Sequence, residues 1–211
     1  MFKNQRIIMK SNYKKLLVIV MILFSVSIFA QDYANLSLDT KDIPVRELRR
    51  FAITGNIGWN SLTGVGVSVN TFATKNIEFD FGLGLASTGF KFGGRFNYVI
   101  LDHEFSPVAG AGILYGMGLG DNVLEVDGDT GPIGYTIGSS PYLQLAFGIE
   151  RLSRKGFFFK LMTGYAILLT DSNYEIKYGN PTPTERDVLD MMMGSGLSIE
   201  VSLGYAFGNN K

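Results

Sequence analysis

The chain contains no cysteine and a single histidine, His103. Without cysteine, disulfides, thiolate nucleophiles, cysteine-ligated metals and a lipidated cysteine behind a leader are all excluded. His103 stands between Asp102 and Glu104 in a short polar segment, where a hydrated turn residue is the simplest interpretation and a proton relay or metal ligand is the alternative. We therefore predict no catalytic residue, no metal site and no cofactor.

Long hydrophobic runs are scarce as well, and the one that is present lies at the N-terminus. Basic residues over 3–15 precede an apolar stretch over 16–29, and the chain becomes polar after Ala30. The apolar stretch is shorter than the roughly 20 residues that a membrane-spanning helix needs. A basic start, a short apolar region and a small residue are typical of a secretory signal peptide, with a membrane anchor as the alternative. We predict a signal peptide over 1–30 and a periplasmic lead over 31–49.

Neither sign of charge dominates, because the chain has 19 Lys and Arg residues against 19 Asp and Glu residues. The basic start of the predicted signal peptide carries no acidic residue, so the remainder of the chain is net acidic. Nucleic-acid binding needs a clustered basic surface. The sequence predicts no such partner.

What is present instead is a repeated alternation of apolar residues with small or polar ones. In the last segment every second residue from Leu197 to Phe207 is apolar, and Ser198, Glu200 and Gly204 are among those between them. A period of two is the signature of a β-strand with two different faces. The pattern predicts eight strands, at about 50–60, 62–72, 77–87, 89–100, 107–119, 139–150, 157–169 and 196–207.

Two kinds of barrel share this alternation. A soluble barrel of the lipocalin type has its apolar face inside, whereas a membrane barrel has it outside. Strands of ten to twelve residues, full charges on the glycine-rich polar face and aromatic residues near strand ends favour the membrane. We predict an all-β, eight-stranded, antiparallel up-and-down transmembrane β-barrel over 50–207, with a short tail over 208–211. The aromatic residues expected at the membrane interfaces are Trp59, Tyr98, Tyr115, Phe157 and Tyr165.

The lengths of the connections alternate along the chain. The segments 73–76, 101–106 and 151–156 are short, whereas 120–138 and 170–195 are long and fall on the other side of the predicted barrel. Short periplasmic turns and longer extracellular loops are typical of outer-membrane barrels. Outer-membrane lipids are therefore the expected surroundings of the barrel, in a Gram-negative cell envelope.

With its predicted signal peptide, eight alternating strands and final Leu203-Gly204-Tyr205-Ala206-Phe207, the chain resembles the small outer-membrane β-barrels of the OmpA/OmpX type. The resemblance covers the barrel domain, roughly residues 50–207. It implies an outer-membrane location. It also implies that Tyr205 and Phe207 form the C-terminal signal read by the barrel-assembly machinery.

The polar faces of the predicted strands place charged residues inside the barrel. A two-residue turn at 87–88 would place Asp80 opposite Arg95, Glu78 opposite Asn97 and Lys91 opposite Gly84. Lys160 and Glu200 are on neighbouring strands and could pair. Confined charges must be paired or hydrated, so the lumen is either filled by a structural network or lined as a narrow polar pathway. The predicted lumen network comprises Glu78, Asp80, Lys91, Arg95, Asn97, Glu150, Lys160 and Glu200.

The two long loops are the expected place for an extracellular partner. Loop 120–138 contains a hairpin pattern around a Gly/Asp turn, which could extend two strands beyond the membrane and bind a partner strand; calcium binding by its acidic residues is the alternative. Loop 170–195 predicts a helix over 185–193, with Thr184 and Asp187 as its cap. Its apolar side could cover the barrel mouth or form a methionine patch for a partner.

These observations predict a non-enzymatic outer-membrane barrel with a structural, adhesion or partner-binding role through its loops. A small pore or solute conduit is the alternative. A lipid-modifying enzyme is a second alternative, disfavoured because His103 is predicted on a periplasmic turn and no histidine is available at the outer rim.

Overall fold

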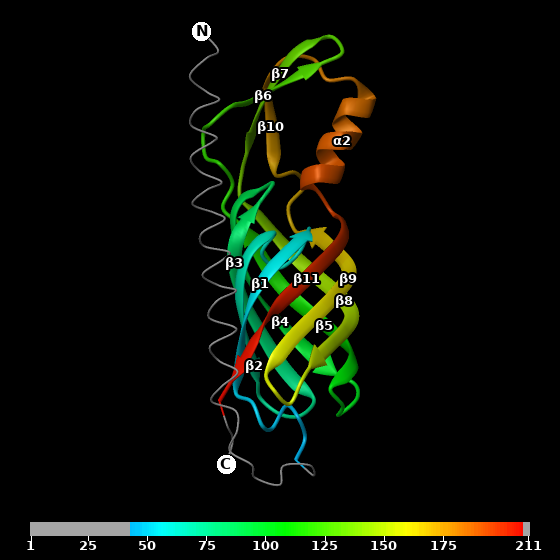
Figure 1. The fold of residues 1–211 in the computed structure, drawn as a ribbon. Helices are drawn as coiled ribbons and strands as arrows, with labels where there is room; N and C mark the ends of the chain where they lie inside the picture. Colours follow the sequence, from blue (N-terminus) through cyan, green and yellow to red (C-terminus); the bar gives the residue numbers. More distant parts are fainter. Residues whose placement is uncertain (1–42, 209–211) are drawn as a thin grey trace. The chain divides into compact units, whose positions relative to one another are not determined.

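The computed structural model describes residues 43–208. The predicted signal peptide, the first part of the predicted lead and the last three residues lie outside this range. Within it, eight antiparallel strands close into a barrel in the order β1-β11-β9-β8-β5-β4-β3-β2 (Figure 1). The barrel strands are β1 (Phe51–Trp59), β2 (Val65–Phe72), β3 (Ile77–Ala86), β4 (Gly89–Val99), β5 (Phe105–Gly116), β8 (Ser140–Leu152), β9 (Phe157–Leu168) and β11 (Gly196–Phe207).

The predicted fold is confirmed. The largest boundary differences, of three residues each, are at the end of β5, which was predicted at 119 and lies at Gly116, and at the start of β2. The sequence pattern placed this start at residue 62, but the strand begins at Val65. Residues 60–64 instead fold inward, so that Leu62 is fully buried and its backbone N–H donates to Glu200 Oε2 at 2.8 Å. Leu62 is out of phase with the outward-facing Val65, Val67 and Val69, so the alternation of the strand does not extend to it.

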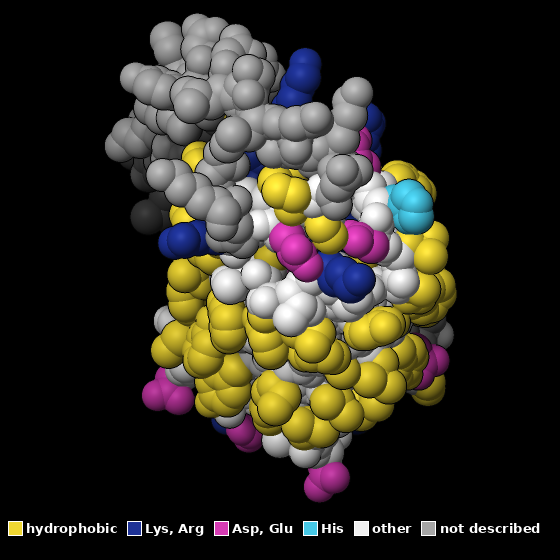
Figure 2. All heavy atoms as spheres, turned by 90° about the horizontal axis from the view of Figure 1, so that it is seen from below, with side chains coloured by type: hydrophobic (Ala, Val, Ile, Leu, Met, Phe, Trp, Pro, Cys, Tyr) yellow, Lys and Arg dark blue, Asp and Glu magenta, His cyan; other side chains and the backbone are white. Residues whose placement is uncertain are grey.

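The outside of the barrel is apolar and its inside is polar, which is the reverse of a soluble barrel. On β8, Leu145 and Phe147 are 52% and 64% exposed, whereas Gln144 between the outward positions is fully buried. Hydrophobic side chains cover much of the wall seen in Figure 2, and charged side chains gather at the lower end. No helix within residues 43–208 is long and apolar enough to cross a membrane.

The interior is filled in layers. Charged and amide side chains occupy the middle. One apolar cluster lies toward the upper end, around Leu62 and Tyr142, and another at the lower end, around Phe72 and Phe158. The filling is tight, because a Cβ added to Gly82 would lie 2.4 Å from Thr63 Cγ2. Interior glycine thus leaves room for the inward 60–64 segment.

The upper end carries a second structure, which we call the cap and define as residues 117–139 and 169–195. It contains a three-stranded sheet of order β10-β7-β6 and the helix α2 (Figure 1). The elements are β6 (Leu124–Gly128), β7 (Gly131–Ile137), β10 (Tyr174–Tyr178) and α2 (Pro183–Met193). The predicted hairpin over 120–138 is therefore present, but it forms a separate sheet and does not extend the barrel strands.

The helix of the cap begins earlier than predicted. Its N-cap is Thr182 and its capping partner is Glu185, in place of the predicted Thr184 and Asp187. The observed pair is a capping box, in which each side chain accepts a hydrogen bond from the backbone N–H of the other residue. Pro183 at the first helical position fits this start, because a backbone N–H at that position would have no partner within the helix and proline has none to leave unpaired.

The lower end of the barrel is closed by short turns and by residues 43–50, which we call the N-terminal segment. Val45 and Leu48 are buried, and Val45 packs in the same apolar cluster as Phe72 and Phe158. Part of the predicted periplasmic lead is therefore an ordered component of the barrel. The three short turns between β2 and β3, β4 and β5, and β8 and β9 lie at this end, opposite the cap.

Candidate functional site

Arg95 occupies the middle of the lumen and joins three parts of the barrel wall. Its Nη2 donates to Asp80 Oδ2 on β3 and to Glu200 Oε1 on β11, each at 2.8 Å. Its Nη1 donates to Gln144 Oε1 on β8 at 3.3 Å. The guanidinium and both carboxylates are almost fully buried. One side chain thus links strands that are not neighbours in the wall, which only an interior network can do.

Lys160 forms the second centre, below Arg95 in the network. Its ammonium contacts the carboxylate of Glu78, lies 3.2 Å from Asp80 Oδ1 and lies 3.3 Å from Glu150 Oε2. Asp80 is shared between Lys160 and Arg95, so the two centres form one continuous network. Burying charges is costly unless they are paired and hydrogen-bonded, and the shared Asp80 gives both cations a carboxylate partner.

Arg46 completes the network from the N-terminal segment. Its Nη2 and Nε donate to Glu150 Oε1 at 2.8 and 3.1 Å, and its Nη1 donates to the carbonyl oxygen of His103 at 3.0 Å. Arg46 was not predicted in the lumen, because residues before the first strand carry no alternation. The only available signal was the pair of apolar residues, Val45 and Leu48, on either side of it.

The predicted pairings within the lumen have mixed outcomes. Asp80 lies opposite Arg95, and Glu78 opposite Asn97, in the register that the two-residue turn predicted. The suggested pairing of Lys160 with Glu200 is wrong. Lys160 lies opposite Ser202 on β11 and opposite Glu150 on β8. It pairs with Glu150 on that neighbouring strand and with Glu78 and Asp80 across the lumen. Both polar atoms of the Asn97 side chain are buried without a hydrogen-bond partner among the described residues.

Lys91 differs from the other lumen cations. It lies opposite Gly84, as predicted, and is only 2% exposed. Its Nζ lies 5.0 Å from the ring centroid of Tyr142, a cation–π arrangement. The ion pairs among residues 43–208 do not include Lys91. It therefore makes no ion pair with the network that joins Arg46, Lys160 and Arg95, although its ammonium is attracted to Glu200 of that network.

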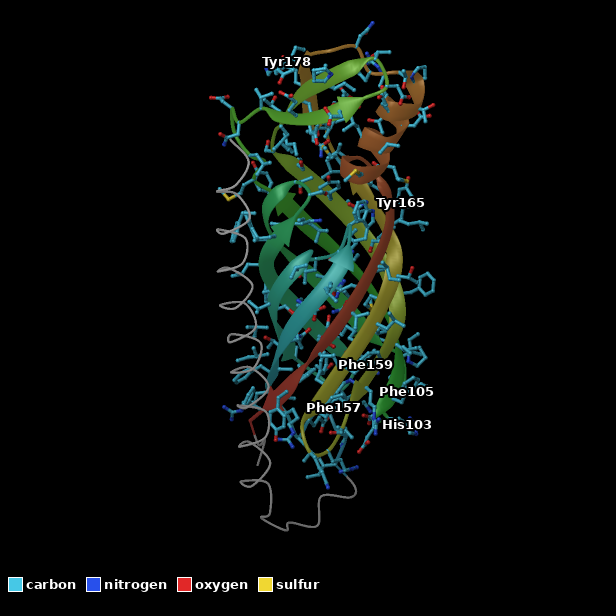
Figure 3. The ribbon with its side chains drawn as sticks, turned by 45° about the horizontal axis from the view of Figure 1, so that its top comes forward. His103, Phe105, Phe157, Phe159, Tyr165 and Tyr178 are labelled. Atoms are coloured by element: carbon cyan, nitrogen blue, oxygen red, sulfur yellow. The ribbon has the colours of Figure 1, made fainter. Side chains whose placement is uncertain are left out.

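The predicted interfacial aromatics all project from the outside of the barrel. Phe157 lies toward the lower end, near Phe105 and His103, whereas Tyr165 lies nearer the cap (Figure 3). All five residues of the predicted set are exposed, namely Trp59, Tyr98, Tyr115, Phe157 and Tyr165. This is the placement that two interfacial belts would require.

The two aromatic residues of the predicted assembly signal lie at the seam that closes the barrel. Phe207, at the end of β11, lies opposite Phe51, at the start of β1, and their rings are 5.5 Å apart. The ring of Tyr205 lies 5.1 Å from that of Phe207. These contacts give the pair a structural role in closure, and recognition by assembly machinery stays a prediction.

The cap is attached to the barrel mouth by a buried polar cluster. Asn173 Nδ2 donates to Ser140 Oγ at 2.9 Å and to the Met193 carbonyl oxygen at 2.7 Å, and the Tyr142 hydroxyl also donates to that carbonyl. The buried face of α2, with Leu189 and Met193, packs on β7 of the cap sheet. The helix therefore covers its own sheet, and only its C-terminal end reaches the barrel mouth.

Glu185 and Tyr174 are among the titratable groups of the cap whose pKa values are shifted by hydrogen bonds and burial. The backbone N–H groups of Thr182 and Asp129 donate to Glu185 at 2.6 and 2.7 Å and hold the pKa of that carboxyl below its usual value. Partial burial raises the pKa of Tyr174 to about 12, helped by its hydrogen bond to Asp190. Neither group lies in a cluster of acidic or histidine side chains that could hold a metal ion, and none is found elsewhere in residues 43–208.

Comparisons with known proteins give a likeness in structure and none in sequence. No family model matches the chain, and no curated protein matches it. Among solved structures, it is similar to the N-terminal β-barrel domain of Pseudomonas aeruginosa OprF, with 11% sequence identity and a TM-score of 0.40. The likeness covers 74% of this chain and 95% of that domain. The strand pairing itself, not this likeness, establishes the closed eight-stranded barrel.

Proposed function

We propose that this chain is an outer-membrane barrel with a closed lumen, whose role is to present the cap to a partner outside the cell. The observation that carries the proposal is the continuous lumen network. Arg46, Lys160 and Arg95 join carboxylates on different sides of the wall, so the barrel has a filled interior. A filled barrel can serve as a support for an external structure.

The outside of the barrel supports the membrane location. Large apolar side chains such as Ile113, Phe147 and Leu197 are 64% or more exposed. Exposed apolar surface costs about 25 cal/mol for each square ångström in water. A continuous wall of such residues is stabilised when hydrocarbon covers it, and the aromatic residues toward both ends fit the two interfaces.

The cap sheet supports the partner-binding role. Its order is β10-β7-β6, so β6 and β10 are its edges. Edge strands carry unpaired backbone N–H and C=O groups, to which an extended segment of a partner can add as a further strand. Val123 and Val126 are exposed along the β6 side and would offer side-chain contacts beside the backbone hydrogen bonds.

The purified full chain is expected to give no conductance steps in planar lipid bilayers, because the paired network and the apolar clusters above and below it occupy the lumen. A large porin incorporated in the same way is the positive control for insertion and detection. Reproducible steps whose ion selectivity changes on Arg95→Gln or Lys91→Gln substitution would instead support the pore alternative.

Deletion of residues 122–137 is expected to abolish adhesion of cells that display the chain to host-cell monolayers. The deletion removes β6 and β7, and with them one edge and the centre of the cap sheet, while the barrel strands stay complete. Display level and heat-modifiable electrophoretic mobility check that the barrel folds. Replacement of exposed Lys75 by Ala at the opposite end is the matched control. Adhesion equal to that of the unmodified chain would refute this role for the cap.

A further inference from the structure

A pocket of about 250 Å³ lies at the cap end of the barrel wall. The end of β1, the inward 60–64 segment, the start of β2 and the turn between β3 and β4 surround it. Its lining includes the polar side chains of Asn60, Thr88 and Lys91. The pocket is separate from the central network, whose cations do not line it.

Two of these side chains have a buried polar atom without a hydrogen-bond partner, and the third, Lys91, makes no ion pair among the described residues. Thr88 Oγ1 and Asn60 Nδ2 are buried and without a hydrogen-bond partner in residues 43–208. Lys91 is 2% exposed, and the contact of its ammonium is with the ring of Tyr142. A buried donor without a partner costs free energy, and a buried ammonium without an ion pair costs more. Such a group is expected to have a counterion.

The chemistry of the lining selects the sign of that counterion. An ammonium offers donors only, and the unpartnered amide nitrogen of Asn60 is also a donor, while the hydroxyl of Thr88 can donate as well. The nearby carboxylate of Glu200 is already used by Arg95 and by the backbone N–H of Leu62. A group that accepts several hydrogen bonds and carries negative charge fits this set, whereas a metal cation does not.

We propose that this pocket binds an oxyanion of the phosphate class, either inorganic phosphate or the phosphate monoester of a lipid headgroup. Lys91 supplies the charge, and Thr88 and Asn60 supply further donors. The lining also includes Trp59, Val65 and Leu85, which are exposed on the outside of the wall. The pocket therefore adjoins the surface at which headgroups would lie. Binding of a lipid headgroup rests on the proposed membrane location, whereas binding of inorganic phosphate does not.

The first experiment titrates the full chain with inorganic phosphate, in a detergent without a phosphate group, and follows binding by calorimetry. Saturable binding is expected. Lys91→Met should weaken it by about tenfold or more, because the interaction lost is charge-assisted, and Thr88→Val should weaken it by about threefold or more. Lys155→Met, at an exposed turn of the opposite end, is the matched control and should bind like the unmodified chain.

The second experiment offers phosphatidic acid or diacylglycerol in detergent micelles and measures retained lipid by native mass spectrometry. The lipid headgroup is identified as the source of the oxyanion by three results together. The chain retains phosphatidic acid but not diacylglycerol, Lys91→Met loses this retention, and inorganic phosphate does not bind. The proposal is overturned if neither probe binds, or if the unmodified chain and Lys91→Met bind equally.

If Lys91→Met does not fold, Lys91→Arg should retain binding and Thr88→Val should weaken it; unchanged binding in Thr88→Val overturns the proposal. These outcomes are independent of the adhesion and conductance tests.

Discussion

Substitution of Arg95 by Met is expected to lower the free energy of unfolding by about 3–5 kcal/mol, the usual cost of removing one partner of a buried ion pair. The substitution leaves the carboxylates of Asp80 and Glu200 buried. Asp80 then has only Lys160 as an ion-pair partner, and Glu200 has none. Urea titration of the chain folded into lipid vesicles measures the change. The fluorescence of Trp59, the single tryptophan, reports on the barrel wall.

Two further variants separate the ion pairs from the side-chain volume. Arg151→Met removes an exposed arginine from the lower end of β8 and should change the free energy of unfolding by no more than about 0.5 kcal/mol. The triple variant Arg95→Met, Asp80→Asn, Glu200→Gln should recover part of the loss, because it no longer leaves carboxylates uncompensated. A loss in Arg95→Met no larger than that in Arg151→Met would show that the network is not paired as described.

Substitution of Leu145 by Arg is expected to destabilise the folded barrel in vesicles by about 2–4 kcal/mol, the cost of a charged residue at the middle of the hydrocarbon layer. Leu145 lies in the middle of β8 and is 52% exposed on the outside of the wall. In a protein surrounded by water, an arginine at such an exposed position would be tolerated. The size of the effect therefore reports directly on what covers the wall.

The matched control places the same charge on an exposed apolar residue of the cap. Val123 is 45% exposed and lies outside the barrel wall, so Val123→Arg should change the free energy of unfolding by no more than about 0.5 kcal/mol. Both variants are compared by urea titration in the same vesicles. Equal and small effects at Leu145 and Val123 would contradict a wall covered by lipid.

The barrel could be predicted from the sequence because its strands obey a local rule. Alternation fixes which side chain points inward, and the tight turn after Ala86 fixes the register, so the residue order alone places Asp80 opposite Arg95. The same reasoning failed for Lys160. Its partners Glu78 and Asp80 are across the lumen, and contacts across a barrel depend on its closure and on the stagger of all its strands.

Segments outside the strands could be predicted less well, because no period constrains them. Arg46 precedes the first strand, yet it reaches Glu150, which is 104 residues away in the chain. Residues 60–64 turn inward in a segment that no alternation marks. Strand β10 in the cap was missed because it is short and pairs with a distant strand. The N-cap of α2 was misplaced by two residues, since Thr182 and Thr184 each have an acidic residue three positions later.

If the wall faces lipid and the network faces inward, consecutive positions of β8 must alternate in their surroundings, and this alternation can be measured directly. The chain has no cysteine, so single cysteines at residues 143–149 can each carry a nitroxide label in vesicles. Collision rates with oxygen, which enriches in hydrocarbon, and with a water-soluble nickel chelate are then measured. We predict high oxygen accessibility at 143, 145, 147 and 149 and low values between them. Access of the nickel chelate to those odd positions would contradict the account.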